Sequence, residues 1–233
     1  MCVGNGHKTM DVLTDAEFNL LIKDAKLMKE DGFGPKVYRR PDATYVKLFR
    51  QKRKFSLSAV WPYVKRFRSN SLQLKKHGID TVKVDALYNC PSIERTVITY
   101  QELPGELFRK VLEHDSSNQR IEQLAEFLAV LHQNGIYFRS IHLENIVLQE
   151  NGKLGLIDIA DMRFRWLALS PLRRVRNLCH MLKYKEDTQL LLVDGKLDHF
   201  LYHYIDRAKL GLMAQHIFAL LVQRYLDPNF KTK

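Results

Sequence analysis

The sequence predicts an α+β protein in which an antiparallel sheet with a helix is followed by a mainly helical region. Four short segments rich in β-branched and aromatic residues have the character of strands: 36–40, 44–50, 81–88 and 95–99. Two later segments repeat apolar residues at helical spacing: 167–184 and 197–226. With 233 residues, of which 45% are hydrophobic, the chain can bury a sizeable core as one large domain or as two lobes.

The first expected element is a helix over 14–30. Its apolar residues recur at helical spacing, and Thr14 and Glu17 have the spacing of a capping box. Gly32-Phe33-Gly34 comes next. It is either an ordinary turn or a phosphate-cradling loop that lacks the third glycine of the usual motif.

A hairpin and a basic helix follow. Segments 36–40 and 44–50 are joined by Pro41-Asp42, a dipeptide typical of turns, so they are expected to pair. Segment 63–77 is a basic helix without any acidic residue, and Gly78 ends it.

A second hairpin places an amide and a carboxylate about one turn. Segments 146–148 and 154–157 are apolar, and Asn151-Gly152 between them favours a two-residue type I′ turn. Counting outward from that turn makes Asn145 and Asp158 cross-strand partners, with Cβ atoms about 5 Å apart. Two such oxygen ligands suit Mg²⁺. The alternative is that Asn145 caps a turn and Asp158 is a solvated strand end.

These motifs resemble the catalytic core of the protein-kinase-like superfamily. Segment 138–145, FRSIHLEN, resembles the catalytic loop H-R-D-x-x-x-x-N, and Asp158-Ile159-Ala160 stands where D-F-G is found. Segment 121–136 is similar to the helix that leads into this loop. Segment 173–182, RRVRNLCHML, looks most like bacterial lipopolysaccharide core (Kdo/heptose) kinases and toluene-tolerance proteins.

The resemblance implies a bilobal fold with an N-lobe over 1–101 and a C-lobe over 102–233. It also implies ATP and Mg²⁺ as cofactors. The site residues that it implies are Lys47 for the ATP phosphates, the backbone near Glu102 and Leu103 for adenine, Asn145 and Asp158 for Mg²⁺, and Arg139 for ordering the loop.

The sequence departs from the family pattern at the catalytic loop. Ser140 stands at the position of the catalytic Asp, and Phe138 replaces the motif His. A neutral hydroxyl is a poor general base near pH 7. His142 or Asp161 is a substitute base if the resemblance holds. Taken singly, His142 is better explained as an ordinary polar loop residue and Asp161 as an exposed carboxylate.

A second departure concerns the lysine. The helix that normally supplies a Glu to pair with Lys47 has no acidic residue here, which leaves only the amides of Asn70 or Gln73 to hydrogen-bond it. An amide cannot provide an ion pair, so nucleotide positioning is affected as well as proton transfer.

Positive charge is concentrated in one stretch. Between Lys36 and Lys76 there are thirteen Lys and Arg residues and one acid, Asp42, while the rest of the chain is nearly balanced. The segment 51–68 interleaves these bases with aromatic residues, Phe55, Trp61, Tyr63 and Phe67. A field of this kind favours an anionic partner, either glycolipid headgroups at a membrane surface or nucleic acid. A solvated basic face is the alternative.

Localisation is expected to be cytoplasmic, with peripheral contact at the inner membrane through the basic N-lobe. No apolar run is long enough to span a bilayer, and the amino terminus lacks the apolar core of a secretory signal. The three cysteines are far apart and are expected to be reduced thiols.

The sequence therefore supports three functional hypotheses. The first is ATP-dependent phosphorylation of a lipopolysaccharide core sugar. The second is a pseudokinase, a binding or regulatory module, because Ser140 replaces the catalytic Asp. The third is nucleic-acid recognition, which ranks last because no RNA-binding motif is present.

Overall fold

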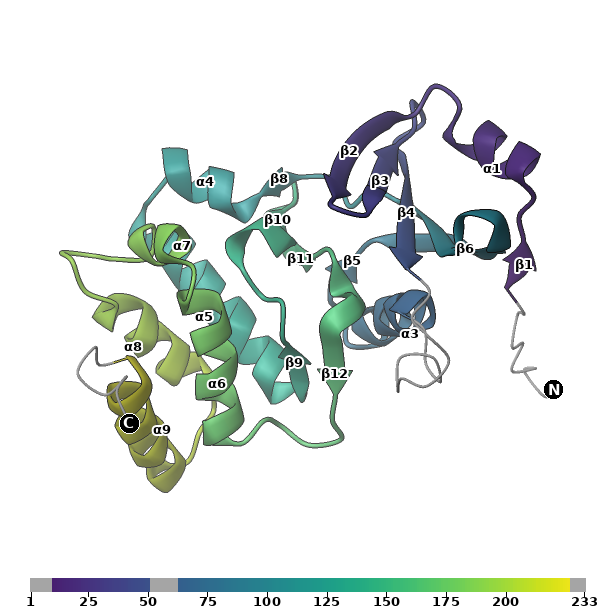
Figure 1. Ribbon diagram of the computed structural model, residues 1–233. Coiled ribbons are helices and arrows are strands. Elements are labelled where there is room, and N and C mark those ends of the chain that lie inside the picture. The colour runs from purple at the N-terminus through teal and green to yellow at the C-terminus, as the bar shows by residue number, and fades with distance from the viewer. Residues whose placement is uncertain (1–9, 51–62, 227–233) are drawn as a thin grey trace. The chain divides into compact units, whose positions relative to one another are not determined.

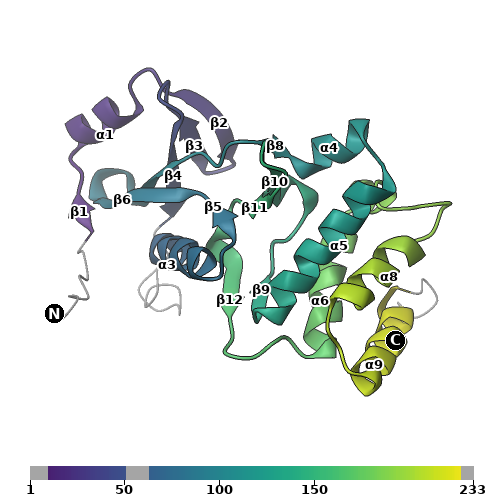
Figure 2. The ribbon, with the colours of Figure 1, turned by 180° about the vertical axis from the view of Figure 1, so that it is seen from behind.

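The computed structural model describes residues 10–50 and 63–226 (Figures 1 and 2). The chain forms two compact units. The first, here the sheet unit, holds the residues up to Ser71 together with Val82–Glu102. The second, here the helical unit, holds Leu72–Thr81 and the residues from Leu103 onward. Leu72–Thr81 thus packs with the helical unit, although its position in the sequence would place it in the first lobe.

The sheet unit is a six-stranded sheet with the order β1-β6-β7-β4-β3-β2. All neighbouring strands are antiparallel except β1 and β6. The strands are β1 (Asp11–Val12), β2 (Lys26–Asp31), β3 (Gly34–Arg39), β4 (Thr44–Arg50), β6 (Lys83–Cys90) and β7 (Arg95–Gln101). A short 3₁₀ turn, η1 (Pro91–Ile93), connects the last two. The core of this unit contains Phe18, Val46, Leu48, Cys90 and Val97.

The first helix is shorter than predicted. Helix α1 (Asp15–Ile22) begins at Thr14 with the expected reciprocal capping box to Glu17. It ends at Ile22 because Asp24 adopts a left-handed backbone conformation, with φ of 60°. The residues from Lys26 to Asp31 are then drawn into β2 by pairing with β3, so the prediction of one helix over 14–30 is wrong in its second half. Gly32-Phe33 is the turn of that hairpin.

The predicted hairpin and basic helix agree with the structure, whereas the predicted strand over 81–88 begins only at Lys83, because Asp80–Thr81 pairs within the helical unit. Strands β3 and β4 pair in register Val37↔Lys47 around the predicted Pro41-Asp42 turn. Helix α3 (Tyr63–Lys76) is followed by Gly78, whose φ of 69° allows the chain to leave the helix. The aromatic residues Phe55 and Trp61 of the basic segment lie outside the described residues.

The helical unit contains α4 (Phe108–His114), α5 (Asn118–Gln133), α6 (Pro171–Leu182), α7 (Lys185–Gln189), α8 (Asp198–Arg207) and α9 (Leu212–Leu226). Helix α5 packs on α8, and α6 packs on α9 (Figure 2). Two small sheets accompany these helices. One has the order β5 (Asp80–Thr81), β11 (Leu154–Leu156), β10 (Ile146–Leu148), β8 (Glu106–Leu107), and the other pairs β12 (Met162–Phe164) with β9 (Ile136–Phe138). The predicted helix over 197–226 is two helices, because Lys209 has a φ of 47° and breaks the run.

A buried polar network joins these helices to β9. His132 on α5 contacts the Tyr204 hydroxyl of α8 through Nδ1 at 2.6 Å and Asn177 Oδ1 of α6 through Nε2 at 3.1 Å. Asn177 also accepts the N–H of Phe138 and donates to its carbonyl, at 3.2 and 2.7 Å. All four residues are buried. The network therefore fixes the backbone at Phe138, the first residue of the candidate catalytic-loop segment 138–145.

The predicted fold class is confirmed. The protein is α+β, with an N-terminal, mostly antiparallel sheet unit and a mainly helical C-terminal unit. Within the part of the chain that the structure describes, no helix combines the length and apolar character needed to cross a bilayer.

Candidate active site

The hairpin that carries the predicted metal pair has a longer loop than expected. Gln149 N–H donates to the Lys153 carbonyl and Gly152 N–H donates to the Gln149 carbonyl, both at 2.9 Å. The loop is therefore the three residues Glu150–Gly152, with Gly152 in a left-handed conformation at φ of 77°. The prediction of a two-residue turn at Asn151-Gly152 is wrong by one residue.

The extra loop residue shifts the register. Strand pairing is Ile146↔Leu156, and the Ile157 N–H donates to the Asn145 carbonyl at 3.0 Å. Asn145 is therefore opposite Ile157, and Asp158 is the next residue along rather than its direct cross-strand partner. In a regular strand, a slip of one residue would send the carboxylate to the other face. At Asp158 the strand has ended, because its φ of 52° and ψ of 42° are left-handed.

This backbone conformation is uncommon for a residue other than glycine, and such outliers cluster at functional sites. Asp158 is exposed at the exit of the hairpin, and Asn145 is buried at the entry to it. The Asn145 amide nitrogen donates to the Ser140 carbonyl at 2.7 Å, which fixes the orientation of the amide and with it the side-chain oxygen. A carboxylate and an oriented amide oxygen at one end of a hairpin fit Mg²⁺, which prefers oxygen ligands.

The loop between β9 and β10 is held in place by hydrogen bonds within the loop and to Asp161. Ser140 Oγ donates to Asp161 Oδ2 at 3.2 Å, and the Arg139 N–H donates to the Asp161 carbonyl at the same distance. The Asn145 N–H donates to the His142 carbonyl at 2.9 Å. The structure thus brings Ser140 and Asp161 together. The carboxylate of Asp161 lies within hydrogen-bonding distance of the residue that stands at the catalytic Asp position.

The base of the loop is anchored by a buried carboxylate. Asp187 Oδ2 accepts the Leu143 N–H at 2.9 Å, and Asp187 also pairs with Arg109 at 3.5 Å. Arg109 contacts three further carboxylates, those of Glu113, Glu144 and Glu186. The hydrogen bonds that Arg109 donates to the carboxylates of Glu186 and then Glu144 raise the pKa of its guanidinium, so it stays charged. This cluster, which sequence patterns did not indicate, ties the loop to α4 and α7.

His142 and Arg139 are the other two residues that were predicted to be catalytic. The His142 ring is partly exposed and lies 5.2 Å from the Tyr184 ring, centroid to centroid. Arg139 is exposed and lines a hollow with Tyr137, Arg163 and other residues. Of the two candidate bases, Asp161 contacts Ser140, with 3.2 Å between Ser140 Oγ and its carboxylate.

The predicted nucleotide residues are divided between the two units, with Lys47 and Glu102 in the sheet unit and Leu103 in the helical unit. In the sheet unit, Lys47 is buried on β4, and its ammonium nitrogen is 5.5 Å from the ring centroids of both Phe49 and Phe67. Asn70, one of its expected amide partners, is buried on α3, the helix that carries Phe67. A buried lysine whose ammonium contacts two aromatic rings is more restricted in position than a mobile surface residue.

Glu102 and Leu103, the residues predicted to contact adenine, differ in environment. The Glu102 carboxylate is engaged by Arg39 at 3.0 Å and by the Tyr45 hydroxyl at 2.9 Å. The backbone N–H of Glu102 donates to the Ala43 carbonyl at 3.4 Å, so this N–H is already bonded within the sheet unit. Leu103 is buried in the helical unit. Their contact with adenine stays a prediction.

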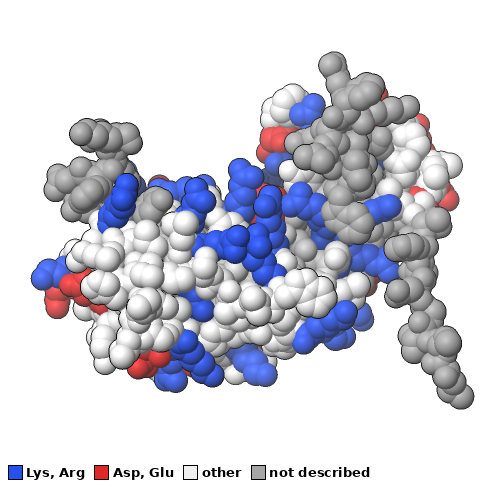
Figure 3. Space-filling view, turned by 90° about the horizontal axis from the view of Figure 1, so that it is seen from below, with Lys and Arg blue, Asp and Glu red and all other residues white. Residues whose placement is uncertain are grey.

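A surface that sequence analysis missed lies beside the loop. It consists of exposed arginines in β12 and α6 and directly after β9 and β12, here called the arginine face: Arg139, Arg163, Arg165, Arg173 and Arg176. Among the described residues, none of these guanidinium groups pairs with a carboxylate. Lys and Arg side chains gather on the surface in Figure 3 with few acidic ones between them. Burial lowers the pKa of His180 in this region, and the charges of Lys183, Arg139 and Arg176 lower it further.

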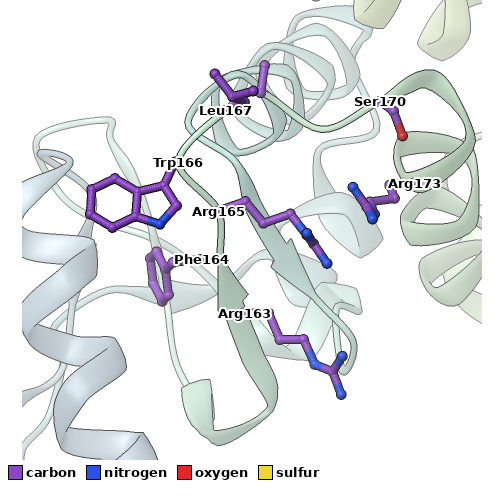
Figure 4. Close-up of a pocket in the computed structure, with 8 residues that line it drawn as sticks. Arg163, Phe164, Arg165, Trp166, Leu167, Ser170 and Arg173 are labelled. Atoms are coloured by element: carbon purple, nitrogen blue, oxygen red, sulfur yellow. The ribbon is translucent and has the colours of Figure 1, made fainter.

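The strand geometry explains how the arginine face forms. Side chains alternate along a strand. Figure 4 shows Arg163 and Arg165 pointing to one side of this segment and Phe164 and Trp166 to the other, while Arg173 reaches from α6 toward Arg165. These residues line a hollow of about 750 Å³, and a second hollow of about 520 Å³ shares Arg163 with it. The pattern Arg-Phe-Arg after the D-F-G-like segment was the available sequence signal.

Comparison with known proteins gives limited matches. No protein-family model matches the chain. Aurora kinase A-A of Xenopus laevis is 35% identical over 85 residues, which are 34% of this chain and 20% of that protein. The chain thus spans a fifth of the length of this curated relative.

Solved structures of WbdD also match the chain. One is described as monomeric WbdD, one as the bifunctional kinase-methyltransferase WbdD and one as WbdD with the kinase inhibitor LY294002. Their TM-scores are 0.48, 0.42 and 0.41, and their sequence identities are 16%, 16% and 17%. Each match covers 79% of this chain but only 43%, 46% and 47% of the respective WbdD chain. These values assign the chain to no family.

Proposed function

We propose that the chain is a kinase-like phosphotransferase that uses ATP to phosphorylate a sugar of an anionic glycolipid, of the lipopolysaccharide core class. The observation that carries the proposal is the loop geometry in the helical unit. There, the Asn145 amide is oriented by Ser140, the Ser140 hydroxyl is bonded to the Asp161 carboxylate, and Asp158 leaves the hairpin in a left-handed conformation. The local sequence similarity to a protein kinase supports the same reading.

Each residue has a distinct role in this proposal. Lys47 supplies a positive charge for ATP phosphates, and Asn145 and Asp158 hold Mg²⁺. Arg139 fixes the loop by its N–H bond to the Asp161 carbonyl. Asp161 accepts the acceptor hydroxyl proton in place of the absent catalytic Asp. Because phosphoryl transfer depends mainly on positioning and charge neutralisation, the loss of the usual Asp is compatible with activity.

The Mg²⁺ assignment is tested by Asp158→Asn. Asparagine also tolerates the left-handed conformation, so the variant is expected to fold. In a thermal-shift measurement, ATP with Mg²⁺ should raise the melting temperature of the wild type through mass action, and Asp158→Asn should lose most of that Mg²⁺-dependent increment. Asp194→Asn is the matched control, because Asp194 is an exposed Asp with a φ of 50°. Equal increments in wild type and Asp158→Asn would contradict the assignment.

A pseudokinase is the second candidate function, and the serine at position 140 favours it. A simple Ser140→Asp change would place two carboxylates at the 3.2 Å contact now made by Ser140 and Asp161, and like charges at that separation oppose joint ionisation. The sharper test is the charge-conserving double swap Ser140→Asp/Asp161→Ser. Transfer of phosphate by the wild type or by the swap supports the enzyme. Nucleotide binding without transfer in either protein supports the binding module.

The arginine face suits the anionic part of the proposed substrate. Arg163, Arg165 and Arg173 converge on one hollow, and arginine forms bidentate contacts with phosphate. Trp166 and Leu167 at the rim are almost fully exposed, at 105% and 81%. Exposed aromatic and apolar side chains beside arginines are typical of proteins that bind at a lipid headgroup layer. We therefore place glycolipid contact here as well as on the basic N-terminal segment.

The double variant Arg163→Ala/Arg165→Ala tests this contact. Each basic residue near an anionic bilayer contributes about 1 kcal/mol, so partitioning onto phosphatidylglycerol vesicles should fall about 30-fold. Lys153→Ala/Lys196→Ala removes the same charge from exposed loops and should cause a smaller loss. Equal losses in the two variants, measured by vesicle sedimentation, would contradict a localised contact. Tight RNA binding that is lost in the arginine variant would favour the nucleic-acid hypothesis instead.

A further inference from the structure

A cluster of three potential metal ligands lies in the helical unit where α8 packs on α5. Glu122 is on α5, and His199 and His203 are four residues apart on α8, which places them on the same face of that helix. One ligand atom from each residue lies within 4.8 Å of the others. Glu122 Oε1 is 3.2 Å from His199 Nε2 and 3.4 Å from His203 Nε2.

One nitrogen of this cluster has no hydrogen-bond partner. His199 Nε2 is buried, and among the described residues it makes no hydrogen bond, even though the Glu122 carboxylate is 3.2 Å away. Buried polar atoms in native proteins almost always have a partner, and an exception calls for an explanation such as an ion. An imidazole nitrogen with a free lone pair is the form that binds a transition metal.

The separations of the glutamate oxygen from the two histidine nitrogens fit a tetrahedral ion. Zinc binds His nitrogen and carboxylate oxygen at about 2.0–2.2 Å, and two ligands at the tetrahedral angle are then about 3.3–3.5 Å apart. The two observed separations, 3.2 and 3.4 Å, agree with this geometry. The side chains of Glu122, His199 and His203 are 41%, 23% and 27% exposed, so water can reach the cluster and complete the coordination.

We propose that Glu122, His199 and His203 form a binding site for a divalent transition metal, best suited to zinc, that fastens α8 to α5. The site joins two segments that are more than seventy residues apart in the sequence. Helix α5 runs directly into β9 and the candidate catalytic loop, so the metal reinforces the scaffold that supports the loop. The proposal does not depend on phosphotransfer activity.

The test uses the full chain without a polyhistidine tag, stripped of metal by a chelator. Zinc titration by calorimetry should show one site per chain in the wild type, and added zinc should raise the melting temperature. His199→Ala and His203→Ala should each weaken the affinity at least about tenfold and abolish the zinc-dependent rise in melting temperature. His216→Ala, which removes an exposed histidine of α9, is the matched control and should bind zinc as the wild type does.

Glu122→Gln separates a metal site from an ion pair. It keeps the shape of the side chain and removes its charge, so zinc affinity should fall while the apo protein remains folded. The proposal is overturned if the wild type binds no stoichiometric zinc. It is also overturned if both histidine variants bind zinc as tightly as the His216→Ala control, because the ion would then be held elsewhere.

Discussion

Replacing Asp161 by asparagine should lower the rate of phosphoryl transfer to the glycolipid by about 10²–10⁴-fold, the usual contribution of a general base. The reason is the position of its carboxylate, which accepts the hydrogen bond of Ser140 at the place of the absent catalytic Asp. Asparagine keeps a side-chain oxygen that can accept the Ser140 hydroxyl, so the local structure is retained while the base is removed. Nucleotide affinity should be unchanged.

The measurement is single-turnover transfer from ATP to core glycolipid, with thermal shift by ATP and Mg²⁺ as the check on binding. His142→Gln is the comparison variant, because His142 is the other residue that the sequence offers as a base. A large loss in His142→Gln with near-normal transfer in Asp161→Asn would assign the proton transfer to the histidine and contradict the role proposed for Asp161.

The hairpin shows how far local sequence determines a site. Asn151-Gly152 correctly predicted a turn, and the apolar segments on either side correctly predicted two strands. The pairing register depended on whether the loop has two or three residues, and both kinds accept a glycine at this place. Asn145 and Asp158 therefore lie at the same end of the hairpin, as predicted, but are not direct partners.

Other differences arose from tertiary contacts that a local pattern does not contain. Lys26–Asp31 has a composition compatible with helix, yet pairing with β3 makes it a strand, because tertiary context overrides weak propensity. The charge distribution was misleading for a similar reason. The net charge of the chain outside 36–76 is close to zero when it is summed along the sequence. The fold nevertheless brings Arg139, Arg163 and Arg176 from separate segments to one hollow.

The cluster of Glu122, His199 and His203 illustrates the same limit. The spacing of the two histidines indicates a shared helical face, but nothing in the sequence relates them to a glutamate on a distant helix. The buried network around His132 is also nonlocal, because its partners Tyr204 and Asn177 come from two other helices.

The hydrogen bonds of this network fix the state of the His132 imidazole. Asn177 donates from Nδ2 to the Phe138 carbonyl and accepts the Phe138 N–H at Oδ1, so its amide orientation is determined. Oδ1 is an acceptor, and His132 Nε2 must therefore carry the hydrogen. His132 Nδ1 then accepts the hydroxyl hydrogen of Tyr204. A protonated ring would have a second N–H facing Tyr204 and a buried charge near Arg174, whose charge opposes it.

Burial accordingly lowers the pKa of His132 to about 3 in the folded protein, whereas an unperturbed histidine has a pKa of about 6.5. Below about pH 6.5 the unfolded chain binds a proton at this ring that the folded chain does not bind, so stability falls as the pH falls. The free energy of unfolding should decrease by about 1.4 kcal/mol per pH unit from this residue alone between about pH 5.5 and pH 4. Urea denaturation of wild type and His132→Gln measures it as the difference between their slopes against pH. Equal slopes, or a His132 ring resonance that titrates near pH 6.5 in the folded protein, would contradict a buried neutral imidazole.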